Sequence, residues 1–371
     1  MQKILSLVWF KIYPPHFGGQ KGIALFNKYL GEHFTIDCLC SRNNEVIADA
    51  GCHIIPELPA SKTQFFNPFA WRKILKQLNK EDYSFVILEQ PYYGLLALWL
   101  KRKINLIIHT HNIESLRFKS LQKKSWPLLF SYEKWSLQKA HLVIFKTKQE
   151  KEFAIQHFSL TEAKCYVLPY GIEDARPYNK KESRKFLSEK YGIKEEEKII
   201  LFAGTLDYEP NADAVEKIYF RIEPLLRQKL PAFKILICGR NKFSAFAYLK
   251  EFKNDNILQA GFVEKIEPYF TGANVFINPV QNVHGVQTKL FDALNYNLNV
   301  VCFEAAARKL PSYLDKKIFI GGDNDFDSFA DRIVQSLTPN FDTPEEFYTD
   351  YSWSNIVKKF ARHLKQNHLA S

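Results

Sequence analysis

Residues 278–294 (NPVQNVHGVQTKLFDAL) place a cation and a carboxylate near the start of an expected helix. A strand ends before a loop that crosses Gly285, and the helix is expected to begin near Thr288. Backbone N–H groups at a helix N-terminus attract phosphate, and Lys289 adds a full positive charge there. Asp292, one helical turn later, could reach the same ligand and hold two ribose hydroxyls. The alternative is an ordinary surface helix that carries a lysine and an aspartate.

Two further turns carry glycines after apolar strands. Gly204 and Thr205 follow a buried run and precede Asn211, which is expected to cap the next helix. Gly18 and Gly19 follow the first strand, where paired glycines let the backbone approach a diphosphate or an acceptor hydroxyl. Each segment could instead be a plain turn. Neither contains G-x-G-x-x-G, so the dinucleotide-binding fingerprint is missing.

Polar residues follow another expected strand, namely His109, His111, Asn112 and Glu114. Open α/β sheets bind ligands at the carboxyl ends of their parallel strands. His111 could donate a hydrogen bond to a sugar hydroxyl or a phosphate oxygen, and Glu114 could order the following turn. The alternative is a helix-capping cluster with Asn112 as N-cap. The two histidines also suggest a metal pair, but no third ligand with suitable spacing follows, so we expect no metal.

These residues must be positioned by strands and helices that alternate along the whole chain. The clearest strand patterns are residues 4–8, 34–39, 85–88, 106–108, 142–145 and 165–168, then runs starting at 199, 235, 257, 275, 300 and 318. Helical patterns lie between them, notably at residues 21–30, 68–78 and 149–158. Several strands are apolar on both faces, as parallel strands covered by helices are. The pattern predicts the α/β class, with doubly wound parallel sheets.

A polar, charged stretch interrupts this rhythm near residues 175–190, after which the rhythm restarts. A chain of 371 residues is also too long for one ordinary domain. We therefore expect a first domain over residues 1–175 and a second over residues 176–351. The tail beyond residue 345 has helical spacing.

The composition limits the kinds of molecule that we expect the protein to bind. There are 51 Lys and Arg against 40 Asp and Glu, a net charge of +11, which favours nucleotide phosphates, acidic lipids or nucleic acid. Zinc-finger spacing, an aromatic RNP run and a clear recognition helix are missing, so we expect no nucleic acid. The six cysteines mostly lie in apolar runs and are expected to be buried and reduced. The apolar run at residues 95–100 is shorter than the ~20 residues that span a bilayer. We expect a cytoplasmic protein, with peripheral membrane contact left open.

The ordered motifs resemble family 4 of the GT-B glycosyltransferases, which are retaining enzymes that use nucleotide sugars. They occur in the family's order along the whole chain, and the ordered set is fairly specific. The motifs are Gly18-Gly19, His111-Asn112-Ile113-Glu114, Leu168-Pro169-Tyr170-Gly171-Ile172, Phe202-Ala203-Gly204-Thr205-Leu206, Ala260-Gly261-Phe262-Val263 and residues 285–293. The resemblance implies two Rossmann-like domains with the active site between them. It also implies that residues 352–371 form a helix that crosses back to the first domain.

The resemblance further implies roles for individual residues. Transfer would retain the anomeric configuration, with a nucleotide-diphosphate sugar as co-substrate and without a cofactor or an obligatory metal. His111 would contact the transferred sugar, and Lys289 and Arg240 would stabilise the leaving diphosphate. The predicted donor-binding residues are Gly18, Gly19, Gly204, Thr205, His284, Gly285, Val286, Gln287, Thr288 and Asp292. The predicted acceptor-binding residues are His16, Gln20, Asn112 and Glu114.

The acceptor implied is a glycan, a lipid-linked hydroxyl or another hydroxyl, in the biosynthesis of cell-surface polysaccharide. The basic surface, together with the aromatic and basic stretch at residues 118–126, suggests an acceptor on lipid or polysaccharide at the inner membrane face.

The chain departs from the family's Glu-x7-Glu motif, because His284 and Asp292 hold the two positions. Asp292 keeps a carboxylate on a shorter arm, whereas His284 cannot accept hydrogen bonds from sugar hydroxyls as a carboxylate does. A catalytically degenerate scaffold that binds a nucleotide or sugar is therefore the main alternative. An epimerase or inverting transferase of this architecture would need a carboxylate acid/base constellation, which we do not identify in the sequence. A dinucleotide oxidoreductase is least favoured, because the glycine fingerprint is missing.

Overall fold

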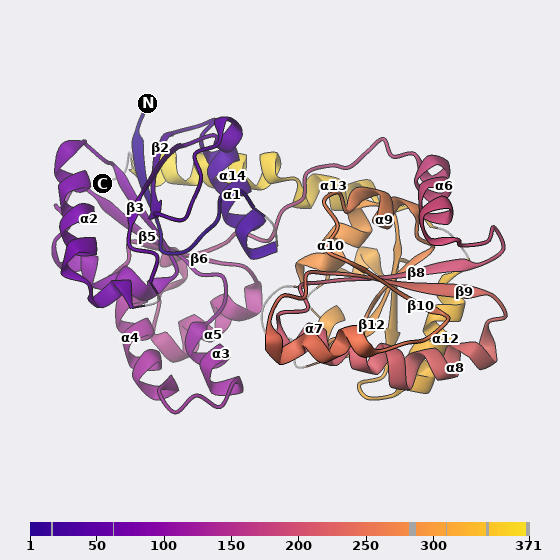
Figure 1. Cartoon of the computed structure of the whole chain (residues 1–371). Helices are drawn as coiled ribbons and strands as arrows, with labels where there is room; N and C mark the ends of the chain where they lie inside the picture. The colour runs from indigo at the N-terminus through magenta and orange to yellow at the C-terminus, as the bar shows by residue number, and fades with distance from the viewer. Residues whose placement is uncertain (16–17, 62, 282–286, 309, 339–340, 369–371) are drawn as a thin grey trace. The chain divides into compact units, whose positions relative to one another are not determined.

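The computed structural model of the chain describes all residues except 16–17, 62, 282–286, 309, 339–340 and 369–371 (Figure 1). The chain divides into two compact units. The first unit comprises residues 1–171 and 351–371, and the second unit comprises residues 172–350. None of the described helices is long and apolar enough to span a membrane.

The first unit is built on a parallel seven-stranded sheet in the order β3-β2-β1-β4-β5-β6-β7. Alternate side chains of β1 face opposite layers: Leu5 and Leu7 join the core that contains α2 and α5, whereas Val8 joins the core that contains α1. The strands are β1 (Lys3–Val8), β2 (Thr35–Ser41), β3 (His53–Leu58), β4 (Phe85–Glu89), β5 (Asn105–His109), β6 (Leu142–Phe145) and β7 (Cys165–Val167).

Helices connect these strands and cover both faces of the sheet. The α-helices are α1 (Gly18–Leu30), α2 (Pro68–Lys80), α3 (Glu114–Ser120), α4 (Trp126–Lys139), α5 (Lys148–Phe158) and α14 (Trp353–His368). Short 3-10 turns are η1 (Ala48–Ala50), η2 (Gln64–Phe66), η3 (Pro91–Leu98) and η4 (Glu162–Lys164).

The C-terminal helix α14 belongs to the first unit, although α13 (Glu345–Tyr351) precedes it at the end of the second. It packs on α1, and its Trp353 ring is fully buried 5.9 Å from the ring of Tyr170. A Cβ on Gly171 would come within 2.5 Å of the Trp353 ring, so only glycine fits there. The expected return of the tail to the first domain is confirmed.

The second unit contains a parallel six-stranded sheet in the order β10-β9-β8-β11-β12-β13. Ile200, Phe202 and Ile237 of this sheet pack against α7, α8 and α12. The strands are β8 (Lys198–Ala203), β9 (Phe233–Cys238), β10 (Ile257–Gly261), β11 (Val275–Asn278), β12 (Asn299–Phe303) and β13 (Ile318–Gly321).

Helices again surround the second sheet (Figure 1). The α-helices are α6 (Lys180–Tyr191), α7 (Glu209–Lys217), α8 (Glu223–Lys229), α9 (Glu267–Gly272), α10 (Thr288–Asn295), α11 (Glu304–Ala307) and α12 (Phe326–Ser336). A π-helical segment η5 (Ile218–Ile222) joins α7 to α8, and η6 (Ser244–Glu251) and η7 (Ser312–Leu314) are 3-10 turns. Two doubly wound α/β units confirm the predicted fold class.

In both units the strand order reverses at the middle of the sheet, between β1 and β4 and between β8 and β11. Loops leave the sheet in opposite directions at such a switch point, and the crevice between them is where open α/β sheets bind ligands. In the first unit those loops follow Val8 and Glu89, and in the second they follow Ala203 and Asn278.

Candidate active site

In the first unit, the carboxyl ends of β4 and β5 bring Glu89 beside His109. The two strands are parallel neighbours, and their register pairs these two residues directly. The side chains of both are fully buried, whereas that of His111 is 17% exposed. A polar cluster with one face open to solvent therefore lies at the ligand-binding edge of the sheet.

The carboxylate of Glu89 accepts hydrogen bonds from both histidines. Its Oε2 lies 3.0 Å from Nδ1 of His109 and 2.6 Å from Nε2 of His111. In neutral His111 the proton is therefore on Nε2, which leaves Nδ1 as a hydrogen-bond acceptor.

The charges in this cluster follow from burial. Burial raises the pKa of Glu89, but the electrostatic attraction and hydrogen bonds of His109 and His111 outweigh burial and hold this pKa well below its usual range. Burial lowers the pKa of His109 to about 3, despite the attraction of Glu89. Burial also lowers the pKa of Lys146 to about 8, which still leaves it mostly cationic at neutral pH. The cluster thus combines a carboxylate, a neutral imidazole and a buried cation.

Glu89, His109 and His111 also form the kind of group that could hold a metal ion, with ligand atoms within 4.8 Å of one another. The expectation considered only residues that follow the histidines in the sequence, and it therefore missed Glu89, a possible third ligand from the adjoining strand. The 2.6 and 3.0 Å contacts are the distances of hydrogen bonds between the groups themselves. The Lys146 ammonium interacts electrostatically with two of the three groups and would oppose a second cation. We therefore interpret the cluster as a hydrogen-bonded network.

The start of α3 is held by Glu133 of α4. Its carboxylate accepts hydrogen bonds from the backbone N–H groups of Glu114 at 2.8 Å and Ser115 at 2.9 Å, and from the Ser115 hydroxyl at 2.6 Å. Burial raises the pKa of Glu133 to about 7, and these hydrogen bonds oppose the rise. The alternative of an Asn112 cap is wrong, because Ile113 occupies the N-cap position without a side-chain bond and a distant glutamate does the capping.

Two predicted acceptor-binding residues are buried with partners inside the first unit. The Oε2 of Glu114 accepts hydrogen bonds from the Tyr92 hydroxyl at 2.8 Å and from Arg117 at 2.6 Å. Gln20 donates from Nε2 to the carbonyl of Lys11 at 2.8 Å. Both side chains thus serve local structure, so their contact with an acceptor stays a prediction.

The other predicted residues of the first unit are distributed as follows. Asn112 is half-buried in the loop after β5. Gly18 and Gly19 form the first turn of α1 rather than a separate loop, and space around Gly19 is open, because an added Cβ would meet nothing within 4 Å. His16 lies outside the described residues.

In the second unit, Lys289 lies in the first turn of α10, against the loop after β8. Its Nζ donates to Oδ1 of Asn211 at 2.6 Å and lies 4.8 Å from the ring centre of Phe202. Asn211 is inside α7, so its predicted N-cap role is wrong; its amide instead donates to the carbonyl of Thr205 at 2.8 Å. A Cβ on Gly204 would lie 2.9 Å from the Asn211 amide nitrogen and 3.1 Å from Lys289 Nζ. The structure therefore brings together predicted residues from two distant segments.

Burial lowers the pKa of Lys289 to about 7. An anion placed beside this amine would favour its charged form, so anion binding and proton uptake are coupled at this position.

Other predicted donor-binding residues lie near Lys289 on the same helix. Gln287 is the N-cap residue of α10, Thr288 is its first residue and Asp292 lies one turn further on, and all three are half-buried. His284, Gly285 and Val286 lie outside the described residues.

Arg240 lies in the loop after β9, which runs beside the loop that carries Gly204. The backbone N–H of Leu206 donates to the carbonyl of Arg240 at 2.8 Å. The guanidinium Nε donates to Asp207 at 2.9 Å, and the other oxygen of Asp207 accepts the backbone N–H of Lys242 at 2.6 Å. Arg240 is thus held by a carboxylate at the ligand-binding edge.

A cavity of about 610 Å³ opens beside Arg240. Gly239 and Gly261, at the carboxyl ends of β9 and β10, contribute backbone, and Phe262 contributes an exposed ring. Four cations line it, namely Arg240, Lys242, Lys250 and Lys253. Cations and an aromatic ring together suit a ligand that has both phosphate and a flat base.

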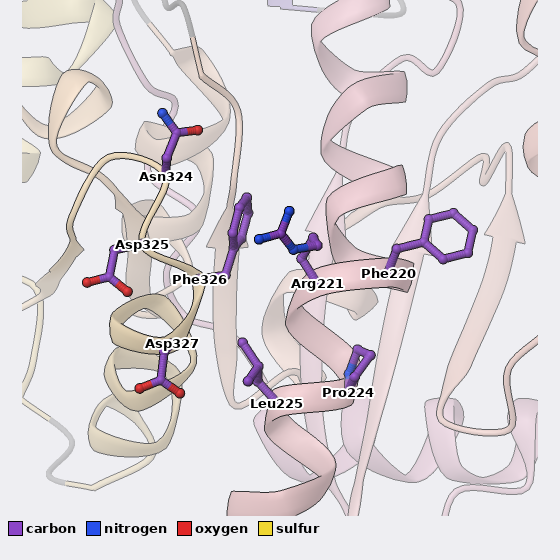
Figure 2. Close-up of a pocket in the computed structure, with 8 residues that line it drawn as sticks. All are labelled: Phe220, Arg221, Pro224, Leu225, Asn324, Asp325, Phe326 and Asp327. Carbon is purple, nitrogen blue, oxygen red and sulfur yellow. The ribbon is translucent and has the colours of Figure 1, made fainter.

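A second cavity, of about 450 Å³, lies between the π-helical segment η5 and the start of α12 (Figure 2). The guanidinium of Arg221 points at the ring of Phe326, with its carbon 4.6 Å from the ring centre. Asp325, the N-cap residue of α12, and Asp327, in its first turn, lie on the other side of that ring. No residue predicted for the site lines this cavity. We assign it no role in the candidate active site.

Two protein families match the chain. Residues 18–176 match the family described as Glycosyltransferase Family 4, and residues 197–338 match Glycosyl transferases group 1. Together the matches take in most of both units, and the chain belongs to the GT-B glycosyltransferases of these families.

One curated relative and two solved structures illustrate the similarity. An uncharacterized 44.6 kDa protein in the cps region of Klebsiella pneumoniae is 25% identical over 244 residues, which is 61% of this chain and 58% of that protein. The chain thus spans 58% of the length of the curated relative that it matches. Sucrose-phosphate synthase from Thermosynechococcus elongatus has a TM-score of 0.81 at 15% identity, with 100% of both chains covered. HepE from Anabaena, in complex with UDP-glucose, has a TM-score of 0.74 at 12% identity, with 99% of this chain and 100% of that chain covered. The two structures share the fold.

Sequence reasoning missed Glu89 and Glu133. Glu89 could have been found, because it ends an apolar strand just as His109 ends the next, and neighbouring parallel strands end at one edge. Glu133 lies in the middle of a helix, and nothing local indicates that it would cap another helix 18 residues away.

Proposed function

We propose that this glycosyltransferase moves a sugar from a nucleotide-diphosphate sugar to a hydroxyl acceptor, with retention of the anomeric configuration. The observation that carries the proposal is the position of Lys289, beside Asn211 and Gly204 at the carboxyl end of β8 and in the first turn of α10. A half-buried amine at a helix N-terminus is suited to a diphosphate.

In this proposal the second unit binds the donor. Lys289 and the N–H groups at the start of α10 stabilise the charge that develops on the leaving diphosphate, and Arg240 contributes a second cation. Each donor of this kind is worth about 3 kcal/mol of transition-state stabilisation. Asp292 holds the ribose hydroxyls, and the cavity beside Phe262 accepts the base. The leaving phosphate takes the acceptor proton, so the reaction needs no cofactor and no metal.

The first unit binds the acceptor and supplies His111, which contacts the transferred sugar. Glu89 holds Nε2 of His111, so the side chain offers Nδ1 to a sugar hydroxyl. Near Gly19 the open space admits an acceptor or phosphate oxygen close to the backbone.

The acceptor that we propose is a glycan or lipid-linked hydroxyl in cell-surface polysaccharide biosynthesis, with the protein in the cytoplasm at the inner membrane face. The cps-region location of the Klebsiella relative supports this setting. The net charge of +11 supports contact with anionic partners. A UDP-sugar is the first donor to test, because HepE was crystallised with UDP-glucose.

The test is a thermal-shift panel of nucleoside diphosphates and their sugar conjugates on the wild type, Lys289→Ala and Asp292→Ala. Lys181→Ala, which removes an exposed lysine from α6 of the same unit, is the matched control. We expect one base to stabilise the wild type and the control, but neither site variant. If no nucleotide stabilises the wild type, the proposal is replaced by its alternative, a catalytically degenerate scaffold, in a form that does not bind nucleotides. Stabilisation without sugar transfer would instead favour a nucleotide-binding scaffold.

A second candidate is transfer with inversion, and the Glu89–His111 pair favours it. Inversion needs a base to take the acceptor proton, and a histidine oriented by a buried carboxylate is such a base. The anomeric proton coupling of the transferred sugar in the product, compared by NMR with that in the donor, distinguishes the two outcomes.

A further inference from the structure

The loop between α3 and α4 forms the tip of a helical hairpin that gathers positive charge. α3 and α4 pack together in the first unit and are joined by residues 121–125 (Figure 1). Residues 115–132 contain four cations and no aspartate or glutamate. The cations are Arg117, which is paired with Glu114, and the exposed Lys119, Lys123 and Lys124. Such a stretch attracts anionic surfaces.

The same tip exposes large apolar side chains. Leu121 is 44% exposed and Leu128 is 79% exposed. Leu121 is the first residue of the five-residue connection and Leu128 lies in the first turn of α4, so both belong to the tip. Exposed leucines beside lysines are the composition of a segment that inserts at a membrane interface.

The lysines of the tip lie over aromatic rings. Nζ of Lys119 is 4.8 Å from the ring centre of Trp126, and Nζ of Lys123 is 4.5 Å from that of Phe118. Each pair presents an apolar ring with a cation on it, which is the arrangement that amphipathic side chains adopt between lipid and water.

The tip is anchored to the ligand-binding edge of the sheet. Glu133 binds the backbone at the start of α3, so this helix cannot rotate freely away from the loop that carries His111. The seven residues of α3 span about 10 Å at 1.5 Å per residue. A surface touching the tip would therefore lie about one short helix away from His111.

We propose that the α3–α4 tip, residues 117–128, docks onto an anionic lipid bilayer. The charge of the tip complements acidic headgroups, and the exposed leucines distinguish a bilayer from a hydrated soluble polyanion, which offers them no apolar phase. The inference rests on the proposed function in one respect, since it names the surface through which a membrane-held acceptor is reached. Nucleotide binding by the second unit does not depend on it.

The test is sedimentation of the full chain with vesicles of phosphatidylcholine alone and of equal parts phosphatidylcholine and phosphatidylglycerol. The wild type is expected to bind the anionic vesicles only. Lys123→Glu combined with Lys124→Glu should lower the partition coefficient by more than about tenfold, as should Leu121→Ser combined with Leu128→Ser. The matched control is Lys181→Glu with Lys185→Glu on α6, which changes the net charge equally and should bind like the wild type.

Three outcomes would overturn the proposal. The first is failure of the wild type to bind anionic vesicles. The second is equal loss of binding in the tip variant and the α6 control, which would mean that only net charge matters. The third is binding that depends on the lysines but not on the leucines and is competed by a soluble acidic polysaccharide, which would identify a polyanion site. Nucleotide thermal shifts are measured on the same variants. If these shifts persist while membrane binding fails, only the docking proposal is overturned and the proposed donor pocket stands.

Discussion

The Oε2 atom of Glu89 lies 2.6 Å from Nε2 of His111; Glu89 ends β4, and His111 lies two residues beyond the end of the neighbouring strand β5. The carboxylate is fully buried, whereas the imidazole is partly exposed. Glu89 therefore acts on a ligand only through His111, by fixing which ring nitrogen carries the proton and where the ring points.

Glu89→Gln should lower the rate of sugar transfer by roughly a hundredfold, because the amide can present its NH2 group to His111 and let the ring move. We expect the loss mainly in kcat. The nucleotide thermal shift should be unchanged, since donor binding is assigned to the second unit. Transfer from whichever nucleotide sugar stabilises the wild type is the measurement.

Nitrogen-15 NMR of the histidine rings separates positioning from simple destabilisation. In the wild type the neutral ring of His111 should carry its proton on Nε2, and in Glu89→Gln this preference should weaken. Glu57→Gln, which changes an exposed glutamate on β3, is the control. An unchanged His111 tautomer in Glu89→Gln would refute the positioning role.

Most of the fold follows from periodicity, but the edge strand β3 does not. Doubly apolar runs identify central strands, because both faces of a parallel sheet are covered. β3 contains Pro56 and is absent from the predicted strands. Proline is tolerated there because β3 pairs only with β2, so one side of its backbone needs no ladder partner.

The candidate site is predicted less completely than the fold. Lys289 is predicted from its place at a helix N-terminus, and Gly204 from the room that a glycine gives the backbone. In the structure the two residues lie next to each other. Asn211 was expected to cap a helix, but its side chain holds Lys289 instead. Such a contact links residues 78 positions apart, so it depends on how strands are ordered in the sheet rather than on any local pattern.

Nucleotide binding should weaken as the pH rises above about 7, because Lys289 then loses its proton in the free protein. A bound diphosphate favours the charged amine and raises its pKa, so binding above pH 7 takes up a proton. The dissociation constant should rise by up to about tenfold per pH unit. Calorimetry between pH 7 and 9 measures the dissociation constant. Repeating it in buffers of different ionisation enthalpy gives the number of protons taken up on binding.

Lys289→Arg is the sharpest comparison for that titration. Arginine stays charged throughout this range, so its dissociation constant should be nearly independent of pH even if its geometry weakens binding overall. The same pH slope in both proteins would mean that another group titrates.

Lys317 should contribute strongly to the stability of the second unit. Its side chain is 1% exposed, and Nζ donates to the carbonyl of Phe341 at 2.7 Å and to the carbonyl of Asn297 at 2.9 Å. Lys317→Met would leave both carbonyls without this donor and remove the hydrogen bonds of a buried cation. We expect a loss of about 3 kcal/mol in the free energy of unfolding, measured by urea denaturation.

The pH dependence of that loss has a definite sign. Burial lowers the pKa of Lys317 to about 8, below its value of about 10.4 in the unfolded chain. Between these values the unfolded chain binds more protons, so this group makes the free energy of unfolding rise with pH. Lys317→Met should lack that rise. Lys316→Met, at the exposed neighbouring position, should keep it.

Gly204→Ala should abolish nucleotide binding by displacing Lys289 rather than by unfolding the second unit. The new Cβ would lie 3.1 Å from Lys289 Nζ and 2.9 Å from the Asn211 amide, both far ends of side chains that can move. The cost in stability should therefore be modest, whereas the amine loses its place in the first turn of α10.

A double-mutant cycle with Lys289→Ala tests whether the effect of Gly204→Ala passes through Lys289, because two changes that act through one contact are not additive. If Gly204→Ala and Lys289→Ala each weaken binding and the double variant is no worse than Lys289→Ala alone, the glycine acts through the lysine. Additive losses would mean that Gly204 instead meets the ligand through its own backbone.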